Sequence, residues 1–229
     1  MPLLNDWKLD NIKVEDILIA QGADPEVIRR RSPRVLEIAE KALELGLQLA
    51  RPAVLIEKYQ VINHSHQKLH LGNGAYLKGA LVAEYLASAE EVFVCIGTIG
   101  NLLEERVTEL MHDKFEEAFA LDSFGSVAVD HLSILVCNYL EGEAREKGNM
   151  ISSAIFPGHE GWPIQEGQSQ LFALVNSREV GVELTTSMMM LPRKSTSFVI
   201  GCGKNISKNG EPCDLCNLRE TCFYRKNRK

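Results

Sequence analysis

A run of five apolar residues, Val92 to Ile96, followed directly by a glycine turn, is the feature that most constrains the fold of this chain. A continuous apolar run of this length is typical of a strand that is buried on both faces of a sheet. The turn, Gly97-Thr-Ile-Gly100, leads into residues whose apolar side chains recur at helical spacing as far as Phe119. A strand covered on both faces and followed by a helix predicts a mixed α/β fold.

Apolar periodicity and capping residues predict the other elements. Ser32 and Pro33 mark a helix start, because serine is a favoured N-cap residue and proline fits the first helical position. The other predicted helices are 12–21, 76–88, 123–147 and 165–176, and the other predicted strands are 53–62, 67–71, 180–186 and 195–201. The glycine and proline residues between 149 and 164 predict a structured loop.

Charge and hydropathy indicate the compartment and exclude some partners. No apolar run approaches the roughly 18 residues of a membrane span, and no signal-peptide core follows Met1, so we expect a cytoplasmic protein without a membrane partner. The net charge is −6, of which residues 202–229 contribute +4 and residues 1–201 contribute −10. A body this acidic does not attract nucleic acid through its general field, so nucleic-acid binding is not expected.

Four of the six cysteines crowd into 21 residues at the C-terminal end. They are Cys202, Cys213, Cys216 and Cys222, whereas Cys95 and Cys137 lie in apolar stretches that suit buried thiols. In a cytoplasmic chain such a cluster favours metal binding over disulfides. We therefore divide the chain into a domain of residues 1–201 and a Cys-rich metal-binding tail of residues 202–229.

The spacing of the tail cysteines leaves the metal open. A Cys-x2-Cys turn at 213 and 216 presents two thiolates to one centre, and the two outer cysteines complete a four-sulfur set. An iron–sulfur cluster, most simply 4Fe–4S, is favoured over zinc, and a disulfide or redox pair is the remaining alternative. The seven Lys and Arg residues of the tail would offset the negative charge of four thiolates.

Two other features are weaker signals. The turn Gly97–Asn101 could hold an anion at a helix start, but it matches neither common nucleotide-binding pattern, so a plain strand-to-helix turn is favoured. His64 and His66 alternate along an extended segment without an accompanying carboxylate or cysteine, which favours solvated histidines over a metal pair. No catalytic triad or catalytic carboxylate pair can be assigned from spacing.

The segment 154–201 carries a recognisable series of motifs. It contains Phe-Pro157-Gly158-His159-Glu-Gly-Trp162-Pro163, then Gln168-Ser-Gln170, then Leu184-Thr-Thr-Ser187 and Pro192-Arg-Lys194-Ser195. This series resembles the activation (reactivation) domain of cobalamin-dependent methionine synthase, especially its free-standing homologues. Upstream, Cys95–Gly100, Leu121–Ser126 and Tyr139-Leu140 also look like that family, so the resemblance covers most of residues 12–201.

The resemblance implies a C-shaped α/β fold with a twisted antiparallel sheet and long helices. It also implies binding of S-adenosylmethionine, so that oxidised cobalamin can be reduced and remethylated. Pro157, Gly158, His159 and Trp162 would form the cofactor-binding loop, with Trp162 either lining the ligand surface or packing the loop onto the sheet. Protonated His159 would favour an anionic ligand group below about pH 6.5.

Three positions depart from the family pattern. The family's arginine aligns with Ala154, its loop aromatic with His159, and an acidic residue of its long helix with Ile134. These departures remove a donor for the ligand carboxylate, so we expect S-adenosylmethionine affinity to be weak or nil.

The sequence leaves three alternative functions open. The first is a corrinoid-linked methyl-transfer or reactivation component that carries an iron–sulfur cluster and acts with a separate cobalamin-binding protein or a methionine synthase core. The second is a non-catalytic binding module whose tail is a structural zinc site. The third, a nucleic-acid-binding zinc protein, fits the basic tail but not the acidic body.

Overall fold

The computed structural model describes residues 7–206, 214, 216 and 219–221. Its centre is a six-stranded sheet in which every neighbouring pair of strands is antiparallel. The strand order is β3-β2-β1-β4-β8-β5, with bounds β1 Ala53–Ser65, β2 Lys68–Leu71, β3 Tyr76–Lys78, β4 Glu91–Thr98, β5 Met150–Ile151 and β8 Ser195–Gly203. The short strands β6 Glu183–Leu184 and β7 Met190–Leu191 form a separate hairpin.

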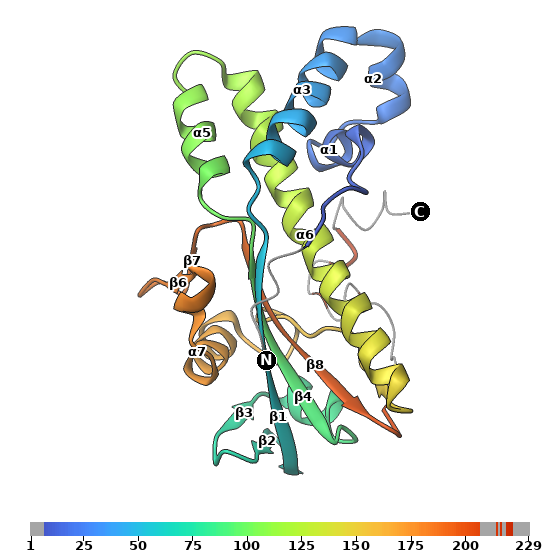
Figure 1. The fold of residues 1–229 in the computed structure, drawn as a ribbon, viewed down its shortest axis with the longest axis vertical. Helices are drawn as coiled ribbons and strands as arrows, with labels where there is room; N and C mark the ends of the chain where they lie inside the picture. Colours follow the sequence, from blue (N-terminus) through green and yellow to red (C-terminus); the bar gives the residue numbers. More distant parts are fainter. Residues whose placement is uncertain (1–6, 207–213, 215, 217–218, 222–229) are drawn as a thin grey trace.

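Helices cover both faces of the sheet (Figure 1). The long helix α6 crosses one face and packs there with α1, α3 and α5. The opposite face is covered by α4, α7 and a short 3-10 helix, η1. The bounds are α1 Val14–Ala20, α2 Pro25–Arg31, α3 Pro33–Leu49, α4 Ala80–Tyr85, α5 Leu102–Leu110, α6 Phe115–Glu146, α7 Ile164–Leu174 and η1 Ser177–Val180.

Strand β4 lies at the centre of this arrangement. Phe93 and Cys95 belong to the hydrophobic core under α6, whereas Val92, Val94 and Ile96 belong to the core on the opposite face. The prediction that residues 92–96 form a strand buried on both faces is therefore confirmed, and so is the mixed α/β class.

Helix α6 packs across one face of the sheet. It is the one helix among the described residues whose length and apolar composition would suffice to cross a membrane. Half of that apolar window is buried inside the protein, and α6 contacts α1, α3, α5, β4, β5 and β8. Its apolar side chains are thus explained by packing in the core.

Three predicted helices differ from the structure. Residues 76–88 begin with β3, where buried Leu77 alternates with exposed Tyr76 and Lys78, and only then continue into α4. The helix expected from Gly100 to Phe119 is divided, because polar residues 112–114 separate α5 from α6, and the helix expected over 123–147 begins earlier, at Phe115. A short strand alternation and a polar break within an apolar series are both difficult to detect from periodicity alone.

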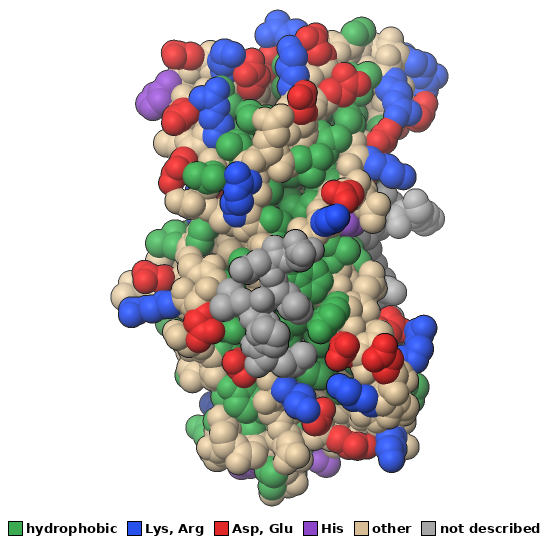
Figure 2. All heavy atoms as spheres, in the orientation of Figure 1, with side chains coloured by type: hydrophobic (Ala, Val, Ile, Leu, Met, Phe, Trp, Pro, Cys, Tyr) green, Lys and Arg blue, Asp and Glu red, His purple; other side chains and the backbone are tan. Residues whose placement is uncertain are grey.

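The surface has an apolar centre on the face shown in Figure 2. Charged side chains gather at the top of the view, over α2, α3 and α5, and again at the lower end of the molecule. Hydrophobic side chains gather between these two regions, beside α6. Phe119 and Ile134 are two exposed apolar residues of α6, 46% and 41% accessible.

Candidate functional site

The predicted ligand loop begins at the edge of the central sheet. After β5 the chain continues beside β8, where the Ser152 N–H donates to the Gly201 carbonyl at 2.9 Å. The Ser152 hydroxyl in turn accepts from the Gly201 N–H at 2.9 Å, and Ile155 pairs with Val199. The loop 156–162 is therefore anchored to a buried strand at its start and leads into α7 at its end.

The loop is held together by its own backbone. The Gly158 N–H donates to the Trp162 carbonyl at 2.8 Å, and the Trp162 N–H donates to the His159 carbonyl at 3.0 Å. Gly158 has a φ of 102°, in the left-handed region that glycine adopts at little cost. These bonds form a compact turn.

Trp162 anchors the loop to the body of the protein. Its side chain is 0% exposed and lies in the core shared with β2, β3, α4 and α7. A Cβ added at Gly79 would lie 2.7 Å from Trp162 Cδ1, and one at Gly167 would lie 3.1 Å from Cε2. The two glycines therefore make room for the indole, and the burial of Trp162 fits the packing alternative.

His159 lies beside Phe156 at the rim of the loop. The two rings meet edge-on with centroids 5.5 Å apart, and His159 Nδ1 accepts a long hydrogen bond of 3.4 Å from the Phe156 N–H. Burial lowers the pKa of His159 from 6.5 to about 4. The expectation that His159 becomes a cationic donor below about pH 6.5 is therefore wrong, because the ring stays neutral well below that pH.

This pKa predicts how the pH affects stability. Between pH 4 and 6.5 the unfolded chain binds a proton at His159 that the folded chain does not, so lowering the pH through this range should destabilise the fold. Urea unfolding at about pH 5 and about pH 7 should show a smaller loss for His159→Gln than for the wild type. An NMR titration midpoint of His159 near 6.5 would contradict the prediction.

The two other departures from the family pattern, Ala154 and Ile134, carry no charge. Ala154 is 3% exposed, beside the strand β8, and Ile134 lies on the exposed side of α6. The chain therefore lacks both the arginine before the loop and the carboxylate on the long helix that the resemblance implies.

The Gln168-x-Gln170 motif attaches α7 to the sheet. Gln168 accepts at Oε1 from the Ser197 hydroxyl at 2.9 Å, inside the core. Gln170 accepts from the Lys78 N–H and donates to the Lys78 carbonyl at 3.1 Å, as a neighbouring strand would. Gln170 thus satisfies the N–H and the carbonyl of Lys78 at the end of the edge strand β3.

Two motifs that are distant in the sequence meet at Lys194. Its ammonium lies 2.9 Å from an Asp122 carboxylate oxygen and 3.0 Å from the Ser126 hydroxyl, both on α6. A Cβ added at Gly125 would lie 3.0 Å from Lys194 Cε, so the glycine makes room for the lysine stem. This network gives a structural role to both the Leu121–Ser126 motif and the Pro192–Ser195 motif. Hydrophobic periodicity in the sequence does not predict the contact.

Removing this ammonium should destabilise the protein modestly. Lys194→Met is expected to lower the free energy of unfolding by about 1 kcal/mol, because the Lys194 side chain is only 13% exposed while Asp122 remains partly solvated. Lys41→Met, which removes an exposed pair with Glu37, is the matched control and should have little effect. Equal urea midpoints for Lys194→Met and the wild type would contradict the prediction.

The glycine turn after β4 is a structural junction. The Ile99 N–H donates to the Lys194 carbonyl at 3.1 Å, the Arg51 N–H donates to the Ile99 carbonyl at 2.7 Å, and the Gly100 N–H donates to Thr98 Oγ1. The turn lines a pocket of about 630 Å³ whose lining has charges of both signs, from Arg51, Glu104 and Glu183, and so shows no preference for an anion. The plain-turn interpretation remains the favoured one.

The comparisons with known proteins agree with this arrangement at the level of the fold. No family model matches the chain. No curated protein matches its sequence. The fold matches a solved structure, the crystal structure of the MetH reactivation domain bound to AdoHcy. The TM-score is 0.60 with 12% sequence identity, and the match covers 93% of this chain and 82% of that chain. The predicted fold, a twisted antiparallel sheet with long helices, is confirmed.

Two of the four tail cysteines, Cys202 and Cys216, lie among the described residues. Cys202 belongs to β8, is 3% exposed and lies in the core under α6, where burial raises the pKa of its thiol. Cys216 is half-buried, and Cys213 and Cys222 lie outside the described residues. Within the described part of the chain, no group of three or more His, Cys, Asp or Glu side chains is arranged to hold a metal ion. The four-cysteine centre stays a prediction.

One described residue of the tail, Arg219, lies close to the ligand loop. Arg219 Nη1 is 3.6 Å from Glu160 Oε2, next to His159 in the loop. The sheet domain also extends beyond the predicted boundary at residue 201, because β8 ends at Gly203 and Ile206 is buried against the sheet.

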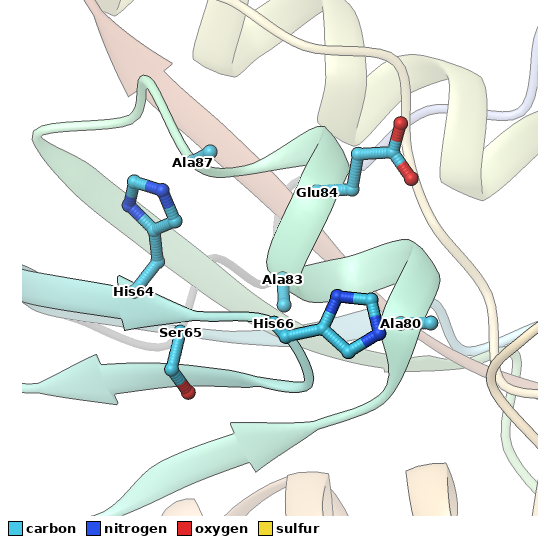
Figure 3. Close-up of a pocket in the computed structure, with 7 residues that line it drawn as sticks. All are labelled: His64, Ser65, His66, Ala80, Ala83, Glu84 and Ala87. Carbon is cyan, nitrogen blue, oxygen red and sulfur yellow. The ribbon is translucent and has the colours of Figure 1, made fainter.

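The paired histidines line a separate pocket of about 580 Å³ (Figure 3). His64 and His66 face α4 across this pocket, whereas Ser65 points to the other side and the Glu84 carboxylate is directed away from both rings. Both histidines are exposed. The arrangement keeps solvated histidines as the favoured interpretation.

Proposed function

We propose that this chain is a corrinoid-linked reactivation component, similar to the methionine synthase activation domain, that acts in the cytoplasm with a separate cobalamin-binding protein or a methionine synthase core. The observation that carries the proposal is the fold match over 93% of the chain. The meeting of two family-like motifs at Lys194, Asp122 and Ser126 supports it independently of the sequence identity.

We expect this chain to differ from its structural neighbour in how it binds the methyl donor. The structural neighbour binds AdoHcy, the demethylated form of S-adenosylmethionine. Here the corresponding loop retains Pro157 and Gly158, but Ala154 and Ile134 offer no charge to an amino-acid group. We propose that S-adenosylmethionine binds weakly or not at all, and calorimetric titration of the full chain tests this directly.

The tail would supply the electron that cobalt reduction requires. We place an iron–sulfur cluster at Cys202, Cys213, Cys216 and Cys222, because reduction of oxidised cobalamin is a one-electron step and such clusters transfer single electrons. A buried thiolate at Cys202 is unfavourable by itself, and the positive charge of a bound metal would offset that cost. The contact of Arg219 with Glu160 would keep this centre near the ligand loop.

Anaerobic purification followed by an absorption spectrum and metal analysis tests the proposal. Brown protein that contains iron and sulfide supports a redox role. Colourless protein with one zinc per chain would instead support the alternative function, a non-catalytic binding module with a structural zinc site.

A further inference from the structure

Exposed apolar side chains gather on the β6–β7 hairpin and the start of α7. Met189 and Leu191 are 51% and 45% exposed, and Ile164, the first residue of α7, is 47% exposed. Figure 1 shows β6, β7 and α7 together on one side of the molecule, away from α6. We call residues 183–191 the methionine arm, because three consecutive methionines, 188–190, lie in it.

The methionine arm is continuous with the ligand loop. The Ser169 hydroxyl of α7 contacts the Met188 sulfur at 3.4 Å, which joins the arm to the helix. At the start of α7, a Cβ added at Gly158 would lie 2.9 Å from Ile164 Cγ1, so Ile164 packs directly on the loop. A single surface therefore runs from the loop along α7 to the arm.

The tip of the arm is fixed in an unusual conformation. Met188 has a φ of 63° and is the one non-glycine residue among those described with a positive φ. The Met188 N–H donates to the Thr185 carbonyl at 2.9 Å, and the Met189 N–H donates to Thr185 Oγ1 at 3.0 Å. A bulky residue in the left-handed region is strained, and such strain gathers at functional sites. The turn holds Met189 in the exposed position.

Several acidic side chains beside this surface are paired with basic ones. Glu160 pairs with Arg219 at 3.6 Å, and Glu166 pairs with Lys78 at 3.7 Å. At the arm itself Glu183 pairs with Arg178 at 3.7 Å. On a body whose net charge is −10, a surface with compensated charges suits a neutral, apolar partner better than a strongly charged one.

We propose that the methionine arm, with Ile164, is the docking surface for a partner protein that presents a neutral apolar face. This inference rests on the proposed function, in which that partner is the cobalamin-binding protein. Methionine side chains adapt to irregular apolar surfaces, so Met189 would fill gaps at the contact while Leu191 and Ile164 supply rigid apolar area. Docking there would place the partner beside the ligand loop and the tail residue Arg219.

The test measures binding of the full chain to the cobalamin-binding fragment of a methionine synthase loaded with hydroxocobalamin. Met189→Glu and Leu191→Glu should each weaken binding by about tenfold or more. Met111→Glu is the matched control, because Met111 is 50% exposed but lies after α5, and it should bind like the wild type.

The outcomes separate this inference from the proposed function. Wild-type affinity in both arm variants would overturn the docking surface and leave the proposed function standing. Absence of binding by the wild type would overturn both. Self-association of the wild type that Met189→Glu abolishes, seen by sedimentation of the chain alone, would assign the arm to a second copy and overturn the partner named here.

Discussion

Replacing Trp162 with alanine is expected to lower the free energy of unfolding by about 4 kcal/mol, the largest effect of any single substitution considered for the loop. The indole is 0% exposed and fills the space between Gly79 and Gly167. Its removal would leave a cavity that close-packed neighbours cannot fill. Urea unfolding of the full chain measures the change.

Two further variants test whether the loss of stability comes from the lost packing of the indole. Trp162→Phe should lose less stability than Trp162→Ala, because Trp162 Nε1 has no hydrogen-bond partner among the described residues and phenylalanine retains much of the ring volume. Gly79→Ala should be destabilising as well, since the new Cβ would lie 2.7 Å from the indole. A Trp162→Ala protein as stable as the wild type would show that the loop is not anchored through this side chain.

Changing Cys216 to serine is expected to abolish metal binding. The Cys-x2-Cys turn positions two of the four proposed thiolate ligands for one metal. Loss of either thiolate should therefore leave an incomplete centre. Cys213→Ser should behave in the same way, and Cys202→Ser should lose both metal and some packing, because Cys202 also belongs to the core under α6. Metal content after anaerobic purification is the measurement.

The control for this set is Cys95→Ala. Cys95 is buried on the same face of the sheet as Cys202 but lies far from the tail in sequence, so its removal should cost stability without loss of metal. Wild-type metal content in the variants at both 213 and 216 would contradict a four-cysteine centre. Loss of metal in those two but not in Cys202→Ser would remove Cys202 from the ligand set.

The central sheet was predictable where its strands have long apolar or alternating runs. Residues 92–96 are buried on both faces, a pattern that a short helix rarely shows, and β1 and β8 were placed within a few residues. The strand β3 was missed because three residues give too little alternation, and its pairing partner β2 decides its conformation. The break between α5 and α6 was missed because the apolar positions on both sides keep helical spacing.

The candidate site was predictable only in part. The motif around Pro157 and Gly158 marked the loop, and the structure shows it as a compact turn on the edge of the sheet. The neutral state of His159 depends on its burial beside Phe156, which no local pattern shows. The contact between Arg219 and Glu160 joins residues 59 positions apart by numbering, so only the fold brings them together.

Electron transfer to cobalt tests the proposed reactivation role most directly. The full chain, purified anaerobically, reduced and freed of reductant, would be mixed with a methionine synthase fragment loaded with cob(II)alamin, and the cobalt(II) signal would be followed by electron paramagnetic resonance. This signal is expected to decay with the wild type but to persist with Cys216→Ser, because one electron from the cluster would convert cobalt(II) to cobalt(I). A signal that persists equally with both proteins would contradict a reactivation role.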